Sequence, residues 1–573
     1  MKKNLYLVIP IVTIILSELV VRVFHGFTQQ YFFAFFFSTS VLLLIDVVFH
    51  NKTFKKTLIH IVVFLTIVGG GFVSSYYSAF DTIVTFGHLG KAGDFSGILV
   101  IIPEYINIDT ILFITLLVSY FILMRRVIIQ SKVLKRKVII LVVSFVIVLG
   151  FNYEVLATKV KQPIFERYGI LFYISYDVIH LKDEVMISKE ELKKIIGAKE
   201  ETIINNAMSG VFEGKNLIVV MVESLDDHVI DEYLPTLSAL KETGIYFDQY
   251  YVPRYQAVTA DSEFIYNTSL IPVLKNGTTF TKYQNNSYNI SLASLFTDKG
   301  YKTYYFHDYY GSFYNRENAI QGLGFDQIFF AEDLGIEVDK GMIEMPKDID
   351  MIKSSLTKID PEHPFYCFYT TISGHQKYER PTTKEYADYY KSVVESKHDD
   401  IFPYYLAAIR LSDDAIDEML LQLEKQQLID ETVIVITSDH SAKKTGNDIV
   451  QKSEESPHLS FKGPLIIWTP GLDRKTVNTI SSSFDVLPTL ANMFSLNYDP
   501  NNYVGKDIFN QGERFIPFYD KQWMTDNGYY DAPRQNYISF AGKSENIKNY
   551  SEKLIEVQEV GQAILKYNYY QIK

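Results

Sequence analysis

The sequence is poor in cysteine, and over most of its length acidic residues outnumber basic ones. Cys367 is the one cysteine in 573 residues, which excludes an intrachain disulfide. Its apolar surroundings predict a small buried side chain. Residues 1–160 carry 14 Lys and Arg against 7 Asp and Glu, a net charge of +7, so the remainder must carry −19 to give the total of −12. This acidic region argues against nucleic acid as a partner.

Long apolar runs are confined to the first 155 residues. Several approach the roughly 20 residues that a helix needs to cross a bilayer. The first is too long, and too closely followed by others, to be a cleaved signal peptide. The sequence therefore predicts about five spans within a transmembrane domain over 1–155. The apolar runs occupy about 5–24, 31–49, 58–77, 107–124 and 138–153.

Basic residues are distributed unevenly among the connections between these runs. Lysines precede the first span and follow the second, and a group of Lys and Arg lies between the fourth and the fifth. The other connections contain Lys91 alone as a basic residue. Positive charge marks the cytoplasmic side of a membrane. We therefore expect a cytoplasmic N-terminus and, after an odd number of spans, an extracellular location for the chain beyond about residue 155.

A connector and an α/β domain are predicted to follow the apolar region. Residues 156–212 are expected to form a helical linker, with Ser188 as the N-cap of an amphipathic helix. That helix either lies on the membrane surface or is an ordinary linker. From Asn216 onward, strands alternate with helices. We expect residues 213–573 to form a mixed, mostly parallel sheet flanked by helices.

Two apolar, β-branched runs end in residues that bind metal ions. One is followed by Glu223 and the other by Asp439 and His440. Carboxylates and imidazoles bind hard or borderline cations, and open α/β sheets bind ligands at the carboxyl ends of their strands. Thr259, in a segment between the two runs, supplies a hydroxyl that a metal ion could activate. We expect Glu223, Thr259, Asp439 and His440 to surround one metal ion.

The ligand types restrict the metal and argue for one site. Mn²⁺, Mg²⁺ and Zn²⁺ all tolerate two carboxylates, an imidazole and a hydroxyl oxygen, and the oxygen-rich set favours the first two. A second cluster is conceivable at Asp226, Asp227 and His228. These residues fall at a predicted helix start, where acidic side chains satisfy free backbone N–H groups. We therefore interpret them as a helix cap.

The ordered set of motifs resembles the lipoteichoic acid synthase family of Gram-positive bacteria, within the alkaline phosphatase/sulfatase superfamily. In that family a strand ending in Glu-Ser supplies a metal ligand, as Glu223-Ser224 would here. A Thr in a Thr-x-Asp-x-Glu-Phe segment, here Thr259-Ala-Asp-Ser-Glu-Phe, is both nucleophile and ligand, and an Asp-His pair completes the site. The resemblance covers nearly the whole chain. It implies a sulfatase-like fold and Mn²⁺ as the cofactor.

The resemblance also implies which residues hold the substrate. The segment Phe313-Tyr-Asn-Arg is similar to an aromatic-Asn-Arg segment that grips glycerophosphate, with Tyr314 in place of Trp. Arg316 would supply a bidentate phosphate contact. His375 is similar to a lone histidine near the phosphate and is a candidate general acid or phosphate donor. His307 is similar to a position near the headgroup, with a core histidine as the alternative.

Two features depart from this family or leave a choice open. Ala257 and Val258 stand where family members often have Gly-Lys, so a cation that would help to hold the phosphate is missing. Arg316 could instead form a surface ion pair with Glu317 or Asp308.

The implied activity is phosphoglycerol transfer at a membrane. Glycerophosphate would move from phosphatidylglycerol, through a covalent Thr259 intermediate, to a lipoteichoic-acid-type or related acceptor, either a glycolipid or a polymer. Cell-envelope assembly proteins are candidate partners. One alternative is a phosphoethanolamine transferase, although such enzymes usually carry several disulfides. Others are a phosphodiesterase of the same superfamily and a degenerate, non-catalytic membrane scaffold. A true sulfatase is disfavoured, because Cys367 begins no Cys-x-Pro-x-Arg segment.

Overall fold

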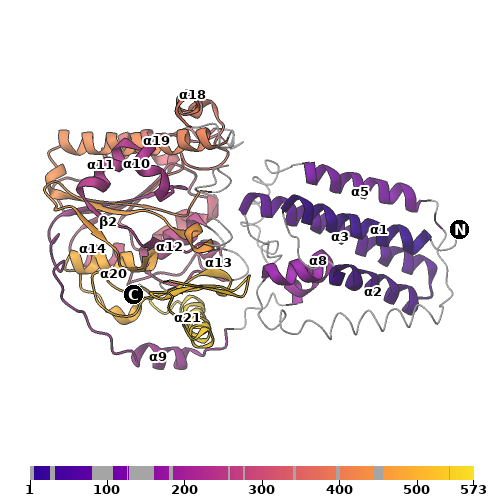
Figure 1. Cartoon of the computed structure of the whole chain (residues 1–573). Coiled ribbons are helices and arrows are strands. Elements are labelled where there is room, and N and C mark those ends of the chain that lie inside the picture. The colour runs from indigo at the N-terminus through magenta and orange to yellow at the C-terminus, as the bar shows by residue number, and fades with distance from the viewer. Residues whose placement is uncertain are drawn as a thin grey trace. The chain divides into compact units, whose positions relative to one another are not determined.

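The chain forms two compact units, Met1–Asp183 and Glu184–Lys573 (Figure 1). A computed structural model describes residues 5–25, 32–80, 108–125, 127, 161–179 and 185–572, apart from 256–257, 275–277, 340–343, 395–400, 443–455 and 541. The boundary between the units falls within the segment expected to connect the two domains.

The N-terminal unit consists of helices that lie alongside one another (Figure 1). Their inward side chains form one apolar core. Many of their outward side chains are also large and apolar, such as Val12, Leu16 and Val23 of the first helix. A helix that is apolar on every side is typical of a membrane span. The helices are α1 (Leu5–His25), α2 (Phe32–Val48), α3 (Lys52–Phe80), α5 (Ile108–Met124) and α8 (Lys161–Ile179).

Two helices among the described residues are long and apolar enough to cross a bilayer. They cover Tyr6–His25 and Lys52–Ser75. Ala34–Val48 and Ile108–Met124 are shorter apolar helices. The fifth expected span, at 138–153, lies outside the described residues. The described residues therefore contain two candidate spans, and the expected domain of five spans is not confirmed.

Charged side chains inside this unit are paired. The ammonium group of Lys55 lies 2.8 Å from a carboxylate oxygen of Asp46, and both side chains are fully buried. Glu18 lies 3.8 Å from Arg22, one helical turn away on α1. A carboxylate oxygen of Glu18 also accepts the Ile170 N–H at 2.7 Å. Pairing of this kind is how apolar helices tolerate ionisable residues.

An eight-stranded sheet forms the centre of the C-terminal unit, in the order β5-β4-β6-β1-β7-β8-β2-β9. β8 is antiparallel to its two neighbours and the other pairs are parallel. This confirms the expected mixed, mostly parallel sheet. The strands are β1 (Asn216–Val222), β2 (Ile245–Phe247), β4 (Lys302–His307), β5 (Gln327–Phe329), β6 (Phe365–Thr370), β7 (Thr432–Ser438), β8 (Leu465–Trp468) and β9 (Lys475–Val477).

Helices cover both faces of this sheet, α10, α11 and α19 on one face and α12, α14 and α20 on the other (Figure 1). The side chains of β1 alternate between the two cores: Val219 packs in one and Val220 in the other. A strand that is covered on both faces becomes a continuous apolar run. The larger helices are α9 (Lys189–Gly197), α11 (Pro235–Thr243), α12 (Thr259–Thr268), α14 (Leu292–Asp298), α17 (Asp348–Ser355), α18 (Lys384–Val393), α19 (Phe402–Lys425), α20 (Ser483–Met493) and α21 (Ile547–Tyr567).

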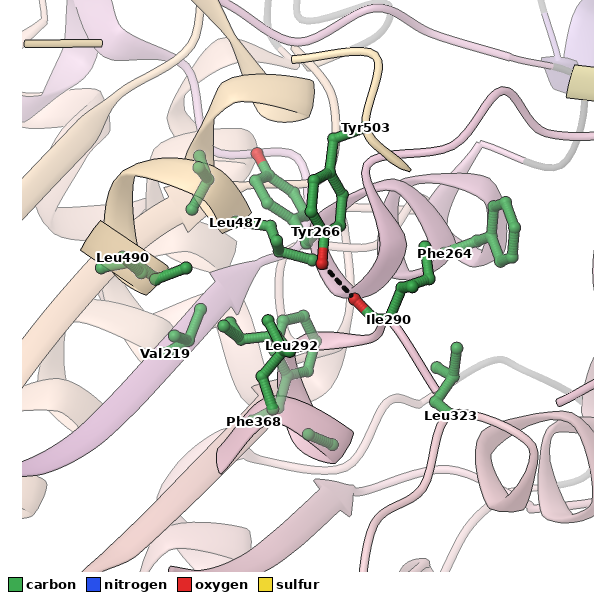
Figure 2. Packing of buried hydrophobic residues seen from close by; sticks show 14 of the residues in the cluster. Val219, Phe264, Tyr266, Ile290, Leu292, Leu323, Phe368, Leu487, Leu490 and Tyr503 are labelled. Carbon is green, nitrogen blue, oxygen red and sulfur yellow. Dashed lines mark hydrogen bonds between the residues drawn. The ribbon is translucent and has the colours of Figure 1, made fainter. Parts of the chain in front are cut away.

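Figure 2 shows the core that holds α12 and α20 against β1. Val219 of β1, Phe264 of α12, and Leu487 and Leu490 of α20 belong to this one buried core. The Tyr503 hydroxyl donates to the Ile290 carbonyl at 2.9 Å. This packing buries α12 along its length from Ala260 to Thr268.

Smaller elements complete the unit. Ser188 caps α9 by accepting the Glu191 N–H at 3.2 Å, which confirms the predicted N-cap. A separate antiparallel sheet contains β11 (Phe515–Pro517), β12 (Trp523–Thr525), β13 (Gly528–Asp531) and β14 (Asn536–Ser539), and β3 (Tyr250–Tyr251) pairs with β10 (Ser481–Ser482). The short helices are η3 (Asp227–Val229), α10 (Ile230–Tyr233), α13 (Thr279–Lys282), η4 (Phe313–Asn315), α15 (Arg316–Gln321), α16 (Ala331–Leu334), η5 (Pro381–Thr383), η6 (Ile429–Glu431), η7 (Pro457–Phe461), η8 (Pro500–Asn502) and η9 (Tyr519–Lys521).

Candidate metal and catalytic site

The predicted metal ligands meet at one edge of the large sheet. β1 and β7 are parallel neighbours, with Val222 opposite Ser438. The residues that follow the two strands therefore lie side by side. One ligand atom from each of Glu223, Asp439 and His440 lies within 4.8 Å of the others, and all three residues are buried.

The hydrogen bonds of this cluster fit a cation. The Nδ1 of His440 lies 3.0 Å from the Ser441 carbonyl, which can only accept, so Nδ1 carries a hydrogen. Its Nε2 faces Glu223 Oε1 at 3.3 Å and Asp439 Oδ2 at 3.2 Å. The buried Asp439 Oδ2 accepts no hydrogen bond from any of the described residues. Carboxylate oxygens and an imidazole nitrogen at such distances require positive charge between them, and this donor set suits a divalent cation.

Electrostatics within the cluster lead to the same conclusion. Burial and the neighbouring Glu223 carboxylate raise the pKa of Asp439 from 3.8 to about 7. Burial also acts to raise the pKa of Glu223, but the His440 imidazole more than offsets it and holds that pKa below its usual range. Two buried carboxylates this close do not both ionise easily without a counter-charge.

Thr259 lies beside the cluster. It is the first residue of α12, it is half-buried, and its hydroxyl donates to Glu223 Oε2 at 3.2 Å. The residue before it, Val258, has a φ of 46°, a strained conformation for a β-branched side chain. Such strain is typical of functional sites. Ala257 lies outside the described residues.

Further polar residues of α12 fasten this helix to the end of β7. Ser262 donates to the Asp439 carbonyl at 2.6 Å, and Tyr266 donates to the Ser438 carbonyl at 2.8 Å. Their spacing from Thr259 places them on the same face of the helix. The helix that begins at Thr259 is thus tied to the end of the strand that precedes two of the candidate ligands.

Arg316 is buried and forms an ion pair that the sequence analysis did not foresee. Its Nε lies 3.2 and 3.0 Å from the two carboxylate oxygens of Glu263. The alternative of a surface ion pair with Glu317 or Asp308 is therefore wrong, because Arg316 is buried and pairs with Glu263. The two terminal nitrogens of Arg316 make no hydrogen bond to any residue that the structure describes.

The segment before Arg316 is backbone-strained. Tyr314 and Asn315 have φ values of 56° and 57°, in the left-handed region. The Tyr314 ring centroid lies 5.5 Å from the guanidinium carbon of Arg316, within reach of a cation–π contact. Tyr314 is half-buried.

His307 ends β4 and is buried near Arg316. Its Nδ1 donates to the Thr370 carbonyl at 2.9 Å, which leaves the lone pair on Nε2. Burial, together with the charge of Arg316, lowers the pKa of His307 to about 3. His307 is therefore neutral at physiological pH. Its Nε2 makes no hydrogen bond within the described part of the chain.

His375 lies in the loop that follows β6, close to Glu223. A β-carbon on Gly374 would lie 2.1 Å from the Glu223 carbonyl oxygen, so the lack of a side chain allows this loop to approach the end of β1. The Nδ1 of His375 donates to the Gln376 carbonyl. Burial lowers the pKa of His375, although the Glu223 carboxylate opposes that change.

Two buried charged residues support the His375 loop. Asp348 accepts the backbone N–H groups of Ile372 and Ser373, each at 2.9 Å. Arg380 donates to the Ser373 carbonyl at 2.5 Å and to the His375 carbonyl at 3.3 Å. No local side-chain pattern pointed to either residue, because each hydrogen-bonds to backbone atoms of this loop.

Comparisons with known proteins show what the chain is similar to. Residues 215–496 match the sulfatase family. The chain is 24% identical to lipoteichoic acid synthase 1 of Bacillus subtilis (strain 168) over 82% of this chain and 80% of the relative. It is 25% identical to lipoteichoic acid synthase of Staphylococcus aureus (strain NCTC 8325 / PS 47) over 78% and 74%. Residues 215–496 are thus a sulfatase-family domain, and most of the chain is similar to lipoteichoic acid synthases.

Solved structures share the fold of this sulfatase-like domain. The lipoteichoic acid synthase LtaP from Listeria monocytogenes has a TM-score of 0.56 at 22% identity, covering 66% of this chain and 98% of that one. A protein in the alkaline phosphatase superfamily from Vibrio parahaemolyticus has a TM-score of 0.50 at 19% identity, covering 67% and 97%. The sulfatase match and the two synthase relatives confirm the resemblance inferred from the motifs, and the two solved structures add the fold alone.

The residues considered for a second metal have other partners in this domain. His228 Nδ1 lies 2.9 Å from a carboxylate oxygen of Asp226. Tyr246 donates to Asp227 at 2.7 Å, and Lys462 lies 3.4 Å from its other carboxylate oxygen. Among the described residues, the cluster of Glu223, Asp439 and His440 is the group that could hold a metal ion.

Proposed function

We propose that this protein is a membrane-bound, divalent-cation-dependent phosphoglycerol transferase. It would move glycerophosphate from phosphatidylglycerol to a lipoteichoic-acid-type or related cell-envelope acceptor, either a glycolipid or a polymer. The observation that carries this proposal is the Thr259 hydroxyl at 3.2 Å from Glu223, beside a three-residue ligand cluster. A nucleophile, a cation site and a buried arginine are the parts that phosphoryl-group transfer requires.

Glu223, Thr259, Asp439 and His440 would hold the cation, with Mn²⁺ as the first candidate and Mg²⁺ or Zn²⁺ as others. When bound, such an ion lowers the pKa of a hydroxyl and neutralises phosphate charge. The Thr259 oxygen would attack phosphorus while the bond from phosphorus to the diacylglycerol oxygen breaks. An acceptor hydroxyl would then attack the same phosphorus and release Thr259. This ping-pong sequence divides one difficult displacement into two.

His375 would carry the proton between the two steps. In its neutral form it donates from Nδ1 to the Gln376 carbonyl, so Nε2 can accept a proton from the acceptor hydroxyl. The protonated ring would then deliver that proton to the diacylglycerol oxygen in the next cycle. Protons balance over one full turnover.

Arg316, Tyr314 and His307 would bind the headgroup. The terminal N–H groups of Arg316 suit two phosphate oxygens, and Tyr314 would lie against the glycerol moiety. Neutral His307, with its lone pair on Nε2, can accept a glycerol hydroxyl. The nearby carboxylate of Glu263 is already occupied by Arg316. This arrangement favours glycerol over the ammonium group of ethanolamine.

The same proposal includes the topology. Five spans within residues 1–155 and a linker over 156–212 would hold the domain over 213–573 on the extracellular side of a Gram-positive cell membrane, with a cytoplasmic N-terminus. Phosphatidylglycerol is then within reach of the site. Cell-envelope assembly proteins are the expected protein partners.

Product analysis would test the substrate assignment. Full-length protein in vesicles that contain labelled phosphatidylglycerol and phosphatidylethanolamine should release diacylglycerol from phosphatidylglycerol, as measured by mass spectrometry of the lipids. Release from phosphatidylethanolamine alone would establish a phosphoethanolamine transferase instead. Release of free glycerophosphate without an acceptor product would establish a phosphodiesterase. Release from neither lipid, with metal bound, would favour the scaffold.

A further inference from the structure

Glu263 is a buried carboxylate that neither binds the candidate cation nor faces solvent. Its side chain is fully buried and accepts the Nε of Arg316 on both oxygens, at 3.2 and 3.0 Å. The Tyr305 hydroxyl donates to Oε1 of the same carboxylate at 2.9 Å. A buried carboxylate is costly unless it is paired and hydrogen-bonded, and Glu263 meets both conditions.

Glu263 contacts Arg316 only through Nε, so the terminal nitrogens of the guanidinium can bind another group. A guanidinium has five N–H donors in one plane. Both contacts with Glu263 use Nε, and the four N–H groups of the terminal nitrogens bond to none of the described residues. Such an edge matches two oxygens of a phosphate group. Glu263 thus fixes the orientation of Arg316 without occupying its anion-binding edge.

Glu263 shares a helix with the candidate nucleophile. It lies four residues after Thr259 on α12, and residues at this spacing lie on the same face of a helix. The same face is fastened to the end of β7 through Ser262 and Tyr266. The buried helix α12 therefore fixes the separation between the candidate nucleophile, Thr259, and Glu263 one turn later.

We infer that Glu263 is a positioning residue that sets the distance between the Thr259 hydroxyl and the guanidinium of Arg316. A phosphate held by Arg316 would then lie where the Thr259 oxygen can reach its phosphorus. Tyr305 assists by fixing the orientation of the carboxylate. This inference rests on the proposed function for the role of Arg316, but the holding of a guanidinium by Glu263 can be measured without any turnover.

A small guanidinium compound can test the holding directly. In full-length Arg316→Ala protein, methylguanidinium should bind in the vacated space against the Glu263 carboxylate and raise the thermal unfolding midpoint. In Glu263→Gln/Arg316→Ala it should not, because the carboxylate charge is lost. Equal stabilisation of the two proteins, or of neither, would overturn the inference. Should Arg316→Ala fail to fold, purification in methylguanidinium followed by its removal makes the same comparison.

Turnover then tests the positioning. With phosphatidylglycerol vesicles and bound divalent metal, Glu263→Gln should lower kcat about tenfold with little change in KM, because binding persists while alignment is lost. Arg316→Gln should lower it further, and Glu263→Gln/Arg316→Gln should match Arg316→Gln within about twofold. Multiplying losses would show that Glu263 acts independently of Arg316 and would overturn the inference.

Two controls separate this inference from its alternatives. Glu317→Gln makes the same chemical change at an exposed residue next to Arg316 and should leave kcat unchanged. Methylguanidinium should restore transfer to Arg316→Ala but not to Glu263→Gln/Arg316→Ala, which a merely structural ion pair would not produce. A wild-type protein that transfers nothing from phosphatidylglycerol would contradict the proposed function, while the methylguanidinium binding would still decide the role of Glu263.

Discussion

Arg316 donates through Nε to both carboxylate oxygens of Glu263, and this pair joins two motifs that are distant in the sequence. Glu263 belongs to the helix that begins at Thr259, and Arg316 follows the strained Tyr314-Asn315 segment. Breaking a buried pair by removing one partner leaves an uncompensated charge, which typically costs about 3–5 kcal/mol. This ion pair therefore links α12, which begins at the candidate nucleophile, to the candidate phosphate-binding segment.

Loss of a charged ligand should remove the metal. Glu223→Ala or Asp439→Ala should abolish both bound metal and turnover, since each deletes a carboxylate of the cluster. Elemental analysis of the purified wild-type chain should find about one divalent ion per molecule. Asp227→Asn is the matched control and should keep its metal, because Asp227 bonds to Tyr246 and Lys462 instead. Full metal retention by both alanine variants would refute the assigned ligands.

Adding one methyl group at Gly374 should move the His375 loop. The new β-carbon would lie 2.1 Å from the Glu223 carbonyl oxygen, so either the loop or the end of β1 must shift. Overpacking of this kind costs about 1–3 kcal/mol, and we expect Gly374→Ala to lower transfer by tenfold or more. Gly197→Ala, where the added carbon meets nothing within 4 Å, should leave activity unchanged and should not lower stability. Wild-type turnover in Gly374→Ala would show that the position of this loop does not matter.

Acid should destabilise the C-terminal unit through His307. The unfolded chain binds a proton there below about pH 6.5, whereas the folded protein keeps this pKa near 3. The unfolding free energy contributed by His307 is therefore full above pH 6.5 and falls by about 1 kcal/mol per unit as the pH drops from 6 to 4. The tryptophans, Trp468 and Trp523, both lie in this unit, so their fluorescence can follow its denaturation.

His307→Asn keeps a donor toward the Thr370 carbonyl but has no titrating ring, and it should show a shallower dependence on pH over this range. The matched control is His363→Asn at an exposed histidine, which should keep the wild-type dependence. Identical slopes for wild type and His307→Asn would show that His307 does not control acid sensitivity.

Cysteine labelling should establish the topology. The native thiol, Cys367, is buried and burial raises its pKa, so it gives little background. In intact cells a membrane-impermeant maleimide should label Lys548→Cys, whose native side chain is 82% exposed. Lys52→Cys, at the start of α3, should label only after lysis. The reverse pattern would place the catalytic unit in the cytoplasm and remove the lipid-headgroup mechanism.

The sheet and the candidate ligand cluster could be predicted because each strand, and the residue that follows it, can be recognised within one short segment of sequence. Strands buried on both faces are continuous apolar runs, and β1 and β7 end next to each other because they are paired in parallel. Glu223, Asp439 and His440 could therefore be grouped from the sequence. The i, i+4 spacing of Thr259 and Glu263 was also visible, but nothing local showed that Glu263 faces Arg316.

Long-range contacts account for what the sequence did not reveal. Asp348 and Arg380 reach the His375 loop through backbone atoms, which leave no side-chain pattern. Arg316 is buried because α15 packs near α12. The local sequence does not predict this burial, because Arg316 stands next to another charged residue, Glu317. Apolar runs near 20 residues predicted spans, and two helices reach that length among the described residues.

The measurement that tests the central claim most directly is mass spectrometry of the peptide that contains Thr259. Wild-type protein incubated briefly with phosphatidylglycerol vesicles and then acid-quenched should carry one glycerophosphate on Thr259, and Thr259→Ser should carry it on the new hydroxyl. Thr259→Ala should bind metal and stay folded, yet form no adduct and release no diacylglycerol. An active Thr259→Ala protein, or an adduct on another residue, would contradict the account.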